Sequence, residues 1–190
     1  MIKYYNITKD KNVVLTEDKK LSSKDLENSF ICEIKKSVAK INVFEKISNN
    51  QYKCTIQLKN NKLSFIAILK NITGAGWKDK PKIKRVQVRN SLLVDNKNIY
   101  KNDISNLNVI FGLYNYDNNP IIVAWDAYKY YNHKTQRSCY VSTDSLLLGY
   151  DKGFYEGVDS SQKIWIFIGS KFNKFIESYT IYIRENGLNE

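Results

Sequence analysis

Apolar side chains recur with two different periods along the chain, and each period predicts a different kind of element. A four-residue period after residue 22 predicts an amphipathic helix, with Ser23 as the residue that caps its first turn. The apolar stripe of this helix consists of Leu26, Phe30, Ile34 and Val38. Residues 1–21 are polar with two short apolar patches, so they predict only a loose first strand.

From residue 41 the period falls to two, which is the period of a strand with one buried face. The alternating stretches 41–47, 52–58 and 63–69 are separated by asparagine-rich turns, so they predict a three-stranded antiparallel meander. Residues 109–116 and 120–128 predict a hairpin that is closed by the Asp-Asn-Asn turn between them.

The last third of the chain mixes both periods. A short helix is expected from residue 144 to about residue 152, with Ser142 or Thr143 as its cap. The apolar run 163–169 predicts a buried strand. The final elements are an amphipathic helix that carries Phe172, Phe175, Ile176 and Tyr179, and a tail at 180–183 that is rich in β-branched residues.

The composition indicates one domain. The chain has 190 residues, of which 43% are apolar, and this is enough to form a hydrophobic core. The pattern contains no internal repeat and no linker, so we expect a single domain over residues 1–190 of the α+β class, mainly β. Within it, residues 1–70 would form a helix and the meander, 71–167 a core with two basic segments, and 168–190 a C-terminal helix and tail.

Charge points to a polyanionic partner. The formal net charge is +11, and the 30 basic residues comprise 26 Lys and only 4 Arg. Three of the four arginines, Arg85, Arg89 and Arg137, fall in two short segments. Arg is the side chain whose planar fork can make two parallel hydrogen bonds, so its concentration there is more informative than the abundant Lys.

The first basic segment covers residues 78–90 and carries six basic residues against one Asp, a local charge of +5. If residues 84–90 form a strand, Arg85, Gln87 and Arg89 share one face, while Val86 and Val88 share the other. Guanidinium and amide groups suit guanine and adenine edges in the DNA major groove, which admits a β-ribbon. The alternative is a solvated edge strand that uses Lys to prevent aggregation.

The second basic segment covers residues 129–140 and mixes hydrogen-bond donors with aromatic side chains. This composition is typical of a loop that contacts phosphates and base edges, although a surface hairpin tip would have a similar composition. Binding of RNA or single-stranded DNA is a further alternative, because 13% of the residues are aromatic.

Motifs for catalysis are weak. No glycine lies in a P-loop arrangement, and His133 is the single histidine, which argues against a Cys/His zinc site. Asp25, Glu33 and Lys35 distantly resemble the carboxylate and lysine set of a metal-dependent endonuclease, and this is the alternative function. We expect no cofactor and no metal.

Two further properties concern the environment of the protein. The odd number of cysteines, 3, favours reduced and partly buried thiols over disulfides. The chain has no apolar run of about 18 residues and no apolar signal core at its start, so we expect a soluble, cytoplasmic protein that does not enter membranes.

A family resemblance supports the nucleic-acid interpretation. It is carried by the motifs Thr73-Gly74-Ala75-Gly76-Trp77, Lys84-Arg85-Val86-Gln87-Val88, Val109-Ile110-Phe111-Gly112-Leu113-Tyr114, Ile121-Ile122-Val123-Ala124-Trp125-Asp126, His133-Lys134 and Gly153-Phe154-Tyr155-Glu156-Gly157. Over residues 71–167 the chain resembles the N-terminal DNA-recognition domain of LlaJI-type restriction enzymes, which are relatives of the McrBC machines. That domain is similar in fold to the EcoRII and BfiI recognition domains and to the B-three domain of plant transcription factors.

The resemblance implies an open seven-stranded β-pseudobarrel with two or three flanking helices, whose two arms grip the DNA major groove. The arms would be residues 73–90 and 125–140. The function implied is sequence-specific recognition of a short site in double-stranded DNA within a restriction-modification system, without catalysis in this chain. The partners implied are double-stranded DNA, a motor or GTPase module and a nuclease subunit.

Candidate DNA contacts follow from the two basic segments. Arg85, Arg89 and Arg137 would contact guanine, and Gln87, Asn132 and Gln136 would contact adenine. Lys78, Lys80, Lys82, Lys129 and Lys134 would bind phosphates, and Trp77, Tyr131 and Tyr140 would pack on the DNA backbone. Lys84, Asn90, His133 and Ser138 complete the set.

Overall fold

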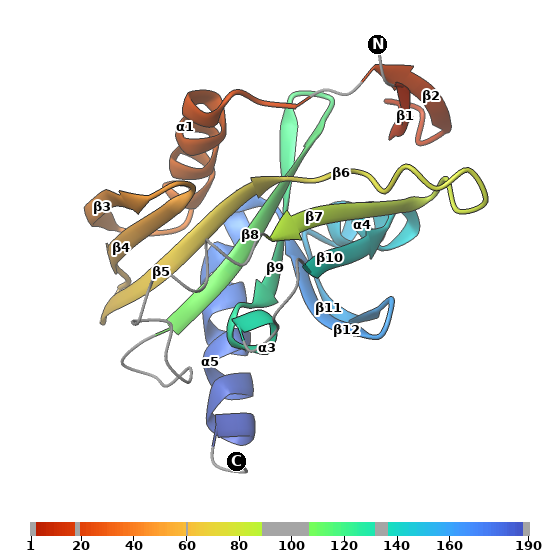
Figure 1. Cartoon of the computed structure of the whole chain (residues 1–190). Coiled ribbons are helices and arrows are strands. Elements are labelled where there is room, and N and C mark those ends of the chain that lie inside the picture. Colours follow the sequence, from red (N-terminus) through yellow and green to blue (C-terminus); the bar gives the residue numbers. More distant parts are fainter. Residues whose placement is uncertain (1–2, 18–19, 60, 89–106, 132–136, 188–190) are drawn as a thin grey trace.

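Long apolar strands form the centre of a mixed sheet of seven strands in the computed structural model (Figure 1). The structure describes residues 3–17, 20–59, 61–88, 107–131 and 137–187. In spatial order, the strands are β11 (Phe154–Asp159), β12 (Gln162–Phe167), β9 (Asn119–Asp126), β8 (Leu107–Tyr116), β5 (Lys62–Asn71), β4 (Gln51–Gln57) and β3 (Lys40–Ser48). We call this the large sheet.

The local pairings of the large sheet are those that the alternation predicts. β3, β4 and β5 form the antiparallel meander, and β8 and β9 form the antiparallel hairpin. The hairpin turns at Asp117 and Asn118, whose positive φ angles of 44° and 61° suit the short polar side chains of such turns. The two units join through a parallel pairing of β5 with β8, which a two-residue turn cannot connect.

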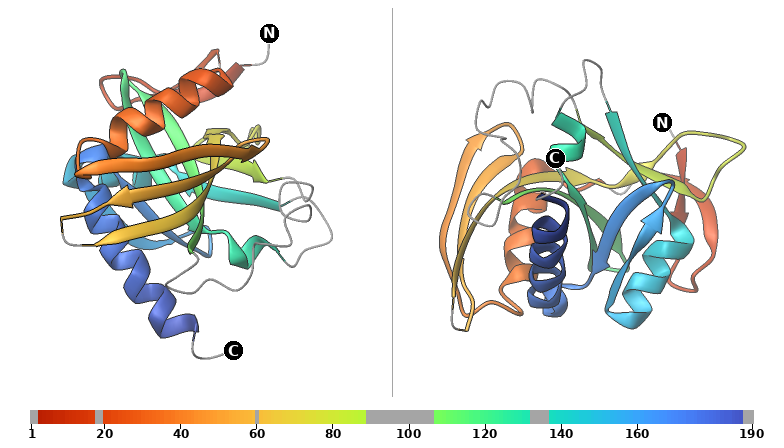
Figure 2. Two further views of the ribbon diagram at one scale, coloured as in Figure 1. Left: turned by 90° about the vertical axis from the view of Figure 1, so that its left-hand side faces the viewer. Right: turned by 90° about the horizontal axis from the view of Figure 1, so that it is seen from below.

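Helices cover one face of the large sheet. α1 (Ser23–Ile34) and α5 (Phe172–Gly187) lie in the hollow of the curled sheet, as the right-hand view in Figure 2 shows. Alternate strand residues point toward them, for example Phe65, Phe111 and Phe167, and these pack with Phe30 and Phe175 of the helices. This aromatic cluster forms the larger of the two cores.

A second sheet covers the opposite face. It consists of β10 (Arg137–Ser142), β7 (Ile83–Val88) and β6 (Thr73–Gly74), in that order, and we call it the small sheet. Together with α4 (Thr143–Lys152) it packs on the remaining strand residues, such as Ile110, Val123 and Ile166. The strands β8, β9 and β12 are therefore buried on both faces, which explains their continuous apolar runs, whereas the edge strands β3 and β11 remain partly exposed.

The N-terminal residues form a separate hairpin of β1 (Lys3–Ile7) and β2 (Val13–Glu17). It lies against the core between the two sheets, where Ile7 is buried and its backbone N–H donates to the hydroxyl of Tyr114 at 2.7 Å. Gly74 of β6 faces Tyr4, and a Cβ at this glycine would lie 2.6 Å from the ring. Residues 1–21, for which the sequence predicted a loose first strand, thus contain a two-stranded sheet.

Two helix boundaries differ from expectation. The cap of α1 is Ser22, whose hydroxyl accepts from the backbone N–H of Asp25 at 3.2 Å, and not Ser23, which is the first residue of the helix. The tail at 180–183 continues α5 as a helix, because Tyr179 and Ile183 are buried on the same helix face. Packing here overrides the low helix propensity of β-branched residues.

The coarse fold class is confirmed: the protein is mainly β with helices on both sides of the large sheet. The boundary drawn between residues 70 and 71 lies inside β5, so the meander and the hairpin belong to one continuous sheet. The described strands of this sheet end at β11 and β3, which do not pair with each other, so the large sheet is not a closed barrel.

Candidate nucleic-acid interface

The two basic segments of the sequence meet in the small sheet. β7 and β10 pair antiparallel over six residues, from Ile83 opposite Ser142 to Val88 opposite Arg137. The described chain stops after Val88 and resumes at Arg137, so both basic segments adjoin the same end of this sheet. The segments expected to form two separate arms are therefore hydrogen-bonded neighbours where the structure describes them.

The strand β7 has one exposed and one buried face, as its alternation predicts. Val86 and Val88 are 0% exposed and lie in the core between the two sheets. Arg85 is partly exposed and Gln87 is exposed on the opposite face. This face carries the guanidinium of Arg85 and the amide of Gln87, and it is exposed at Gln87 and partly exposed at Arg85.

Cross-strand pairing extends the exposed face over all three strands. Arg85 lies between Thr73 of β6 on one side and Tyr140 of β10 on the other. Gln87 lies opposite Ser138. Thr73 was not among the candidate residues, although period two places it on the exposed face. The five side chains form a polar surface with one aromatic ring, which we call the open face.

The connection between β6 and β7 carries an exposed tryptophan over this face. Residues 75–82 project from the body of the protein at the right of Figure 1. The chain turns at Gly76, where φ is +80°, and Trp77 is 39% exposed. The ring of Trp77 packs against that of Tyr140 with 5.2 Å between centroids, and the ammonium of Lys80 lies 5.7 Å from the tryptophan ring.

Three lysines follow the tryptophan in this connection. Lys78, Lys80 and Lys82 are all exposed. Lys82 forms a 3.2 Å ion pair with Asp144 in the first turn of α4, and both side chains are well exposed. Such a pair contributes little to stability, so it leaves Lys82 available to a phosphate.

Lys84 does not belong to the open face. It is 0% exposed, and its ammonium donates to the backbone carbonyl of Tyr5 in β1. Position 84 has the same parity as Val86 and Val88, so a strand places all three on the buried face. We correct the expectation that Lys84 contacts DNA: it secures the N-terminal hairpin beneath the small sheet.

The second basic segment is described only in part. Lys129 lies in the one-turn helix α3 (Tyr128–Tyr131), and its ammonium is 5.3 Å from the ring of Tyr182 in α5. Lys129 therefore points toward the helix layer and not toward the open face. For Tyr131 and Arg137 the structure gives the backbone. The candidates Arg89, Asn90, Asn132, His133, Lys134 and Gln136 lie outside the described residues.

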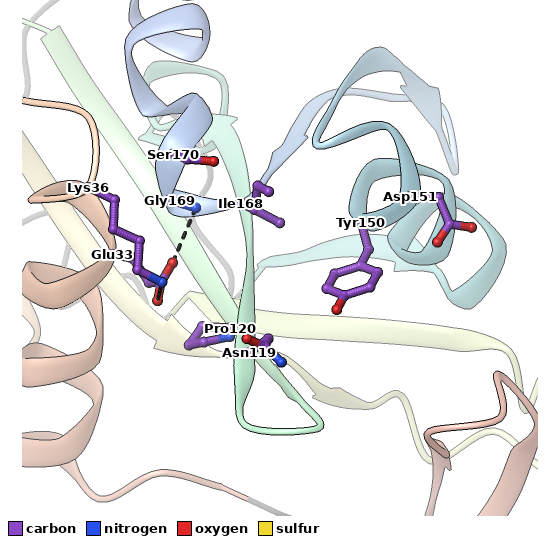
Figure 3. Close-up of a pocket in the computed structure, with 9 residues that line it drawn as sticks. All are labelled: Glu33, Lys36, Asn119, Pro120, Tyr150, Asp151, Ile168, Gly169 and Ser170. Carbon is purple, nitrogen blue, oxygen red and sulfur yellow. Dashed lines mark hydrogen bonds and ion pairs between the residues drawn. The ribbon is translucent and has the colours of Figure 1, made fainter.

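The alternative metal site is not assembled. Asp25 and Glu33 are eight residues apart on α1, which corresponds to about 12 Å along the axis. Glu33 lines a cavity of about 380 Å³, where its carboxylate already accepts from the backbone N–H of Gly169 at 3.2 Å and from Lys36 at 2.5 Å (Figure 3). Among the described residues no three His, Cys, Asp or Glu side chains gather as metal ligands do.

The cysteines are free thiols, as expected. Cys54 and Cys139 are buried, and burial raises the pKa of both thiols. Cys32 is exposed, contrary to the expectation of partial burial. Cys139 lies beside Val86 in the register of the small sheet, so it packs beneath the open face.

The protein is thus a β-rich scaffold whose small sheet presents a polar, partly aromatic face, with exposed lysines on the connection beside it. A family model described as methylase-associated X1 matches residues 63–176, more than half of the chain. The chain belongs to this family. The matched segment runs from β5 into α5 and includes the whole small sheet.

An association with methylases agrees with the restriction-modification role that the sequence resemblance implied. Neither the curated proteins nor the solved structures contain a match to the chain. None of the helices in the described ranges is long and apolar enough to cross a membrane.

Proposed function

We propose that the protein is the sequence-specific DNA-recognition component of a restriction-modification system and that it binds duplex DNA with the open face of the small sheet. The observation that carries this proposal is the pairing of β7 with β10. This pairing brings Arg85, Gln87, Ser138 and Tyr140 onto one solvent-facing surface. A β-ribbon of this width fits the major groove, and the groups it presents match base edges.

The surroundings of the open face suit a DNA backbone. Lys78 and Lys80 lie on the projecting connection beside Trp77, where they would reach phosphates on one side of the groove. The net charge of +11 favours association with any polyanion, so the lysines would supply affinity and the β7 face would supply selectivity.

We further propose that the protein is a recognition domain of the LlaJI type with a B-three-like pseudobarrel. Two observations support this fold. Seven described strands, β6 to β12, fall within residues 71–167, and these strands surround the core beneath the small sheet. Methylase, motor and nuclease activities would then belong to partner modules, and this chain would bind DNA without cutting it.

The test begins with selection of bound duplexes from a random pool by the full chain. Titrations of the selected duplex and of a scrambled duplex then compare two variants. Arg85→Ala should lose about 1–3 kcal/mol of binding on the selected duplex and little on the scrambled one. Lys80→Ala should weaken both duplexes alike and reduce the slope of log K against log salt by about 1.

Each variant has a matched control. Arg184 is an exposed arginine of α5, and Lys46 is an exposed lysine of β3, and both are far from the small sheet in sequence and layer. Arg184→Ala and Lys46→Ala should bind both duplexes like the wild type. Failure to enrich any duplex, or equal losses from Arg85→Ala and Arg184→Ala, would overturn the proposal.

A further inference from the structure

The outer edge of β10 is bound by side chains in place of another strand. β10 is the edge strand of the small sheet, so alternate backbone groups point away from β7. Gln162 occupies two of them: its Oε1 accepts from the backbone N–H of Tyr140 at 2.8 Å, and its Nε2 donates to the carbonyl of Ser138 at 3.2 Å. One amide side chain thus mimics the pair of hydrogen bonds that a neighbouring strand would make.

Asp159 continues these contacts along the same edge. Its Oδ2 accepts from the backbone N–H of Ser142 at 2.8 Å and from the Ser142 hydroxyl at 2.7 Å. Burial alone would raise the pKa of Asp159, but the hydrogen bonds that it accepts from Ser145, Ser142 and Ser160 lower it overall. The carboxylate is therefore held in its charged, accepting form.

Both side chains come from one tight turn of the large sheet. Asp159 and Gln162 are Cα partners at the end of the β11–β12 hairpin, on either side of Ser160 and Ser161. Those two serines have φ angles of 51° and 62°, the left-handed pair of a two-residue hairpin turn. The turn fixes the spacing of Asp159 and Gln162, so that they meet β10 at Ser142 and Tyr140.

We infer that Gln162 and Asp159 are positioning residues for DNA recognition. They contact the backbone of Ser138, Tyr140 and Ser142, and two of these residues supply side chains to the open face. A side chain that contacts a base must be held within about 0.5 Å of its productive position. The hairpin end of the rigid large sheet provides that support where β10 has no neighbouring strand.

This inference rests on the proposed function, and the decisive variant is Gln162→Ala. Removal of the amide leaves the N–H of Tyr140 and the carbonyl of Ser138 to water, so β10 stays paired with β7 but is no longer held against the end of the β11–β12 hairpin. The ratio of affinities for the selected and the scrambled duplex should fall about tenfold, within the range of one base contact. Affinity for the scrambled duplex and the salt slope should stay at the wild-type values.

A matched control separates positioning from general stability. Gln57 lies in β4, next to the edge strand β3 of the large sheet. Its amide also donates to backbone carbonyls, those of Leu58 at 3.0 Å and Asn61 at 3.3 Å. Gln57→Ala should reduce the unfolding free energy about as much as Gln162→Ala does. It should leave the duplex preference unchanged, because Gln57 does not contact the small sheet.

The conservative variant Gln162→Glu tests the two hydrogen bonds separately. A glutamate retains an acceptor for the N–H of Tyr140 but loses the donor to the carbonyl of Ser138. It should recover part of the lost duplex preference. Recovery to no more than the Gln162→Ala value would contradict positioning through Tyr140.

A measurement without DNA keeps this inference apart from the proposed function. Amide proton exchange by NMR should accelerate at Tyr140 in Gln162→Ala and at Ser142 in Asp159→Ala, and stay unchanged at Val86. If the wild type shows no duplex preference, the proposed function fails, whatever the exchange rates are. If the wild type is selective and Gln162→Ala keeps the same preference, or if exchange at Tyr140 does not change, the positioning role is wrong.

Discussion

The large sheet and the small sheet differ in what covers their faces. The central strands of the large sheet are covered by α1 and α5 on one side and by the small sheet and α4 on the other. The small sheet has a buried face with Val86 and Val88, and an open face with Arg85 and Gln87. Substitutions in the large sheet should therefore alter stability, and substitutions on the open face should alter binding.

The largest effect is expected at the aromatic core of the large sheet. Phe111 is 0% exposed, and its ring lies 4.9 Å from that of Phe30 and 5.5 Å from that of Phe175. Phe111→Ala should lower the unfolding free energy by about 3–5 kcal/mol, because it leaves a cavity. Urea denaturation measures it. A loss below about 1 kcal/mol would show that this core is not the scaffold.

A smaller loss is expected at Gly112, where the two sheets are in close contact. A Cβ at Gly112 of β8 would lie 2.6 Å from Ile72 and 2.9 Å from Val86, both beneath the small sheet. Gly112→Ala should cost about 1–3 kcal/mol through overpacking. In urea denaturation, the double variant Gly112→Ala with Ile72→Ala should lose less than the sum of the two single losses. Strict additivity would contradict the close contact.

The link between the sheets should depend on pH. The pKa of Asp159 is lowered from its ordinary 3.8 in the folded state. Its charge therefore stabilises the fold above that pH, and the contribution is lost as the pH falls through the lowered value. The stability difference between wild type and Asp159→Asn should be constant near neutrality and shrink below about pH 4. A difference that grows on acidification would have the wrong sign.

The smallest effect on stability is expected on the open face. Arg85→Ala should change the unfolding free energy by no more than about 0.5 kcal/mol, since the side chain is partly exposed. The same variant should lose duplex preference, as proposed above. Thermal unfolding and duplex titration on one preparation give both values. A large loss of stability would place Arg85 in the scaffold and remove the contrast between the two sheets.

Local pattern predicted much of this fold. The period-two stretches gave the meander, the β8–β9 hairpin and the two faces of β7, because side chains alternate strictly in a strand. The four-residue stripe of α1 was also correct at Leu26, Phe30 and Ile34, which are buried. These features depend only on neighbours in sequence, so the sequence contains them directly.

Long-range features were not predictable in the same way. The parallel pairing of β5 with β8 joins residues about forty positions apart, and no local pattern records the partner. Lys84 was misplaced because a lysine in a basic run suggests exposure, although its parity with Val86 placed it inside. The roles of Gln162 and Asp159 depend on hydrogen bonds to the backbone of β10. Every strand residue offers the same backbone groups, so the sequence does not indicate which strand these side chains contact.

The central claim is that duplex DNA covers the open face of the small sheet, and Trp77 offers a direct test. Trp125 and Trp165 are 0% exposed, whereas Trp77 is 39% exposed beside Tyr140, so acrylamide quenching of tryptophan fluorescence reports mainly on Trp77. Addition of the selected duplex should reduce this quenching, and Trp77→Phe should abolish the response. A duplex that binds tightly while quenching of Trp77 stays unchanged would contradict the account.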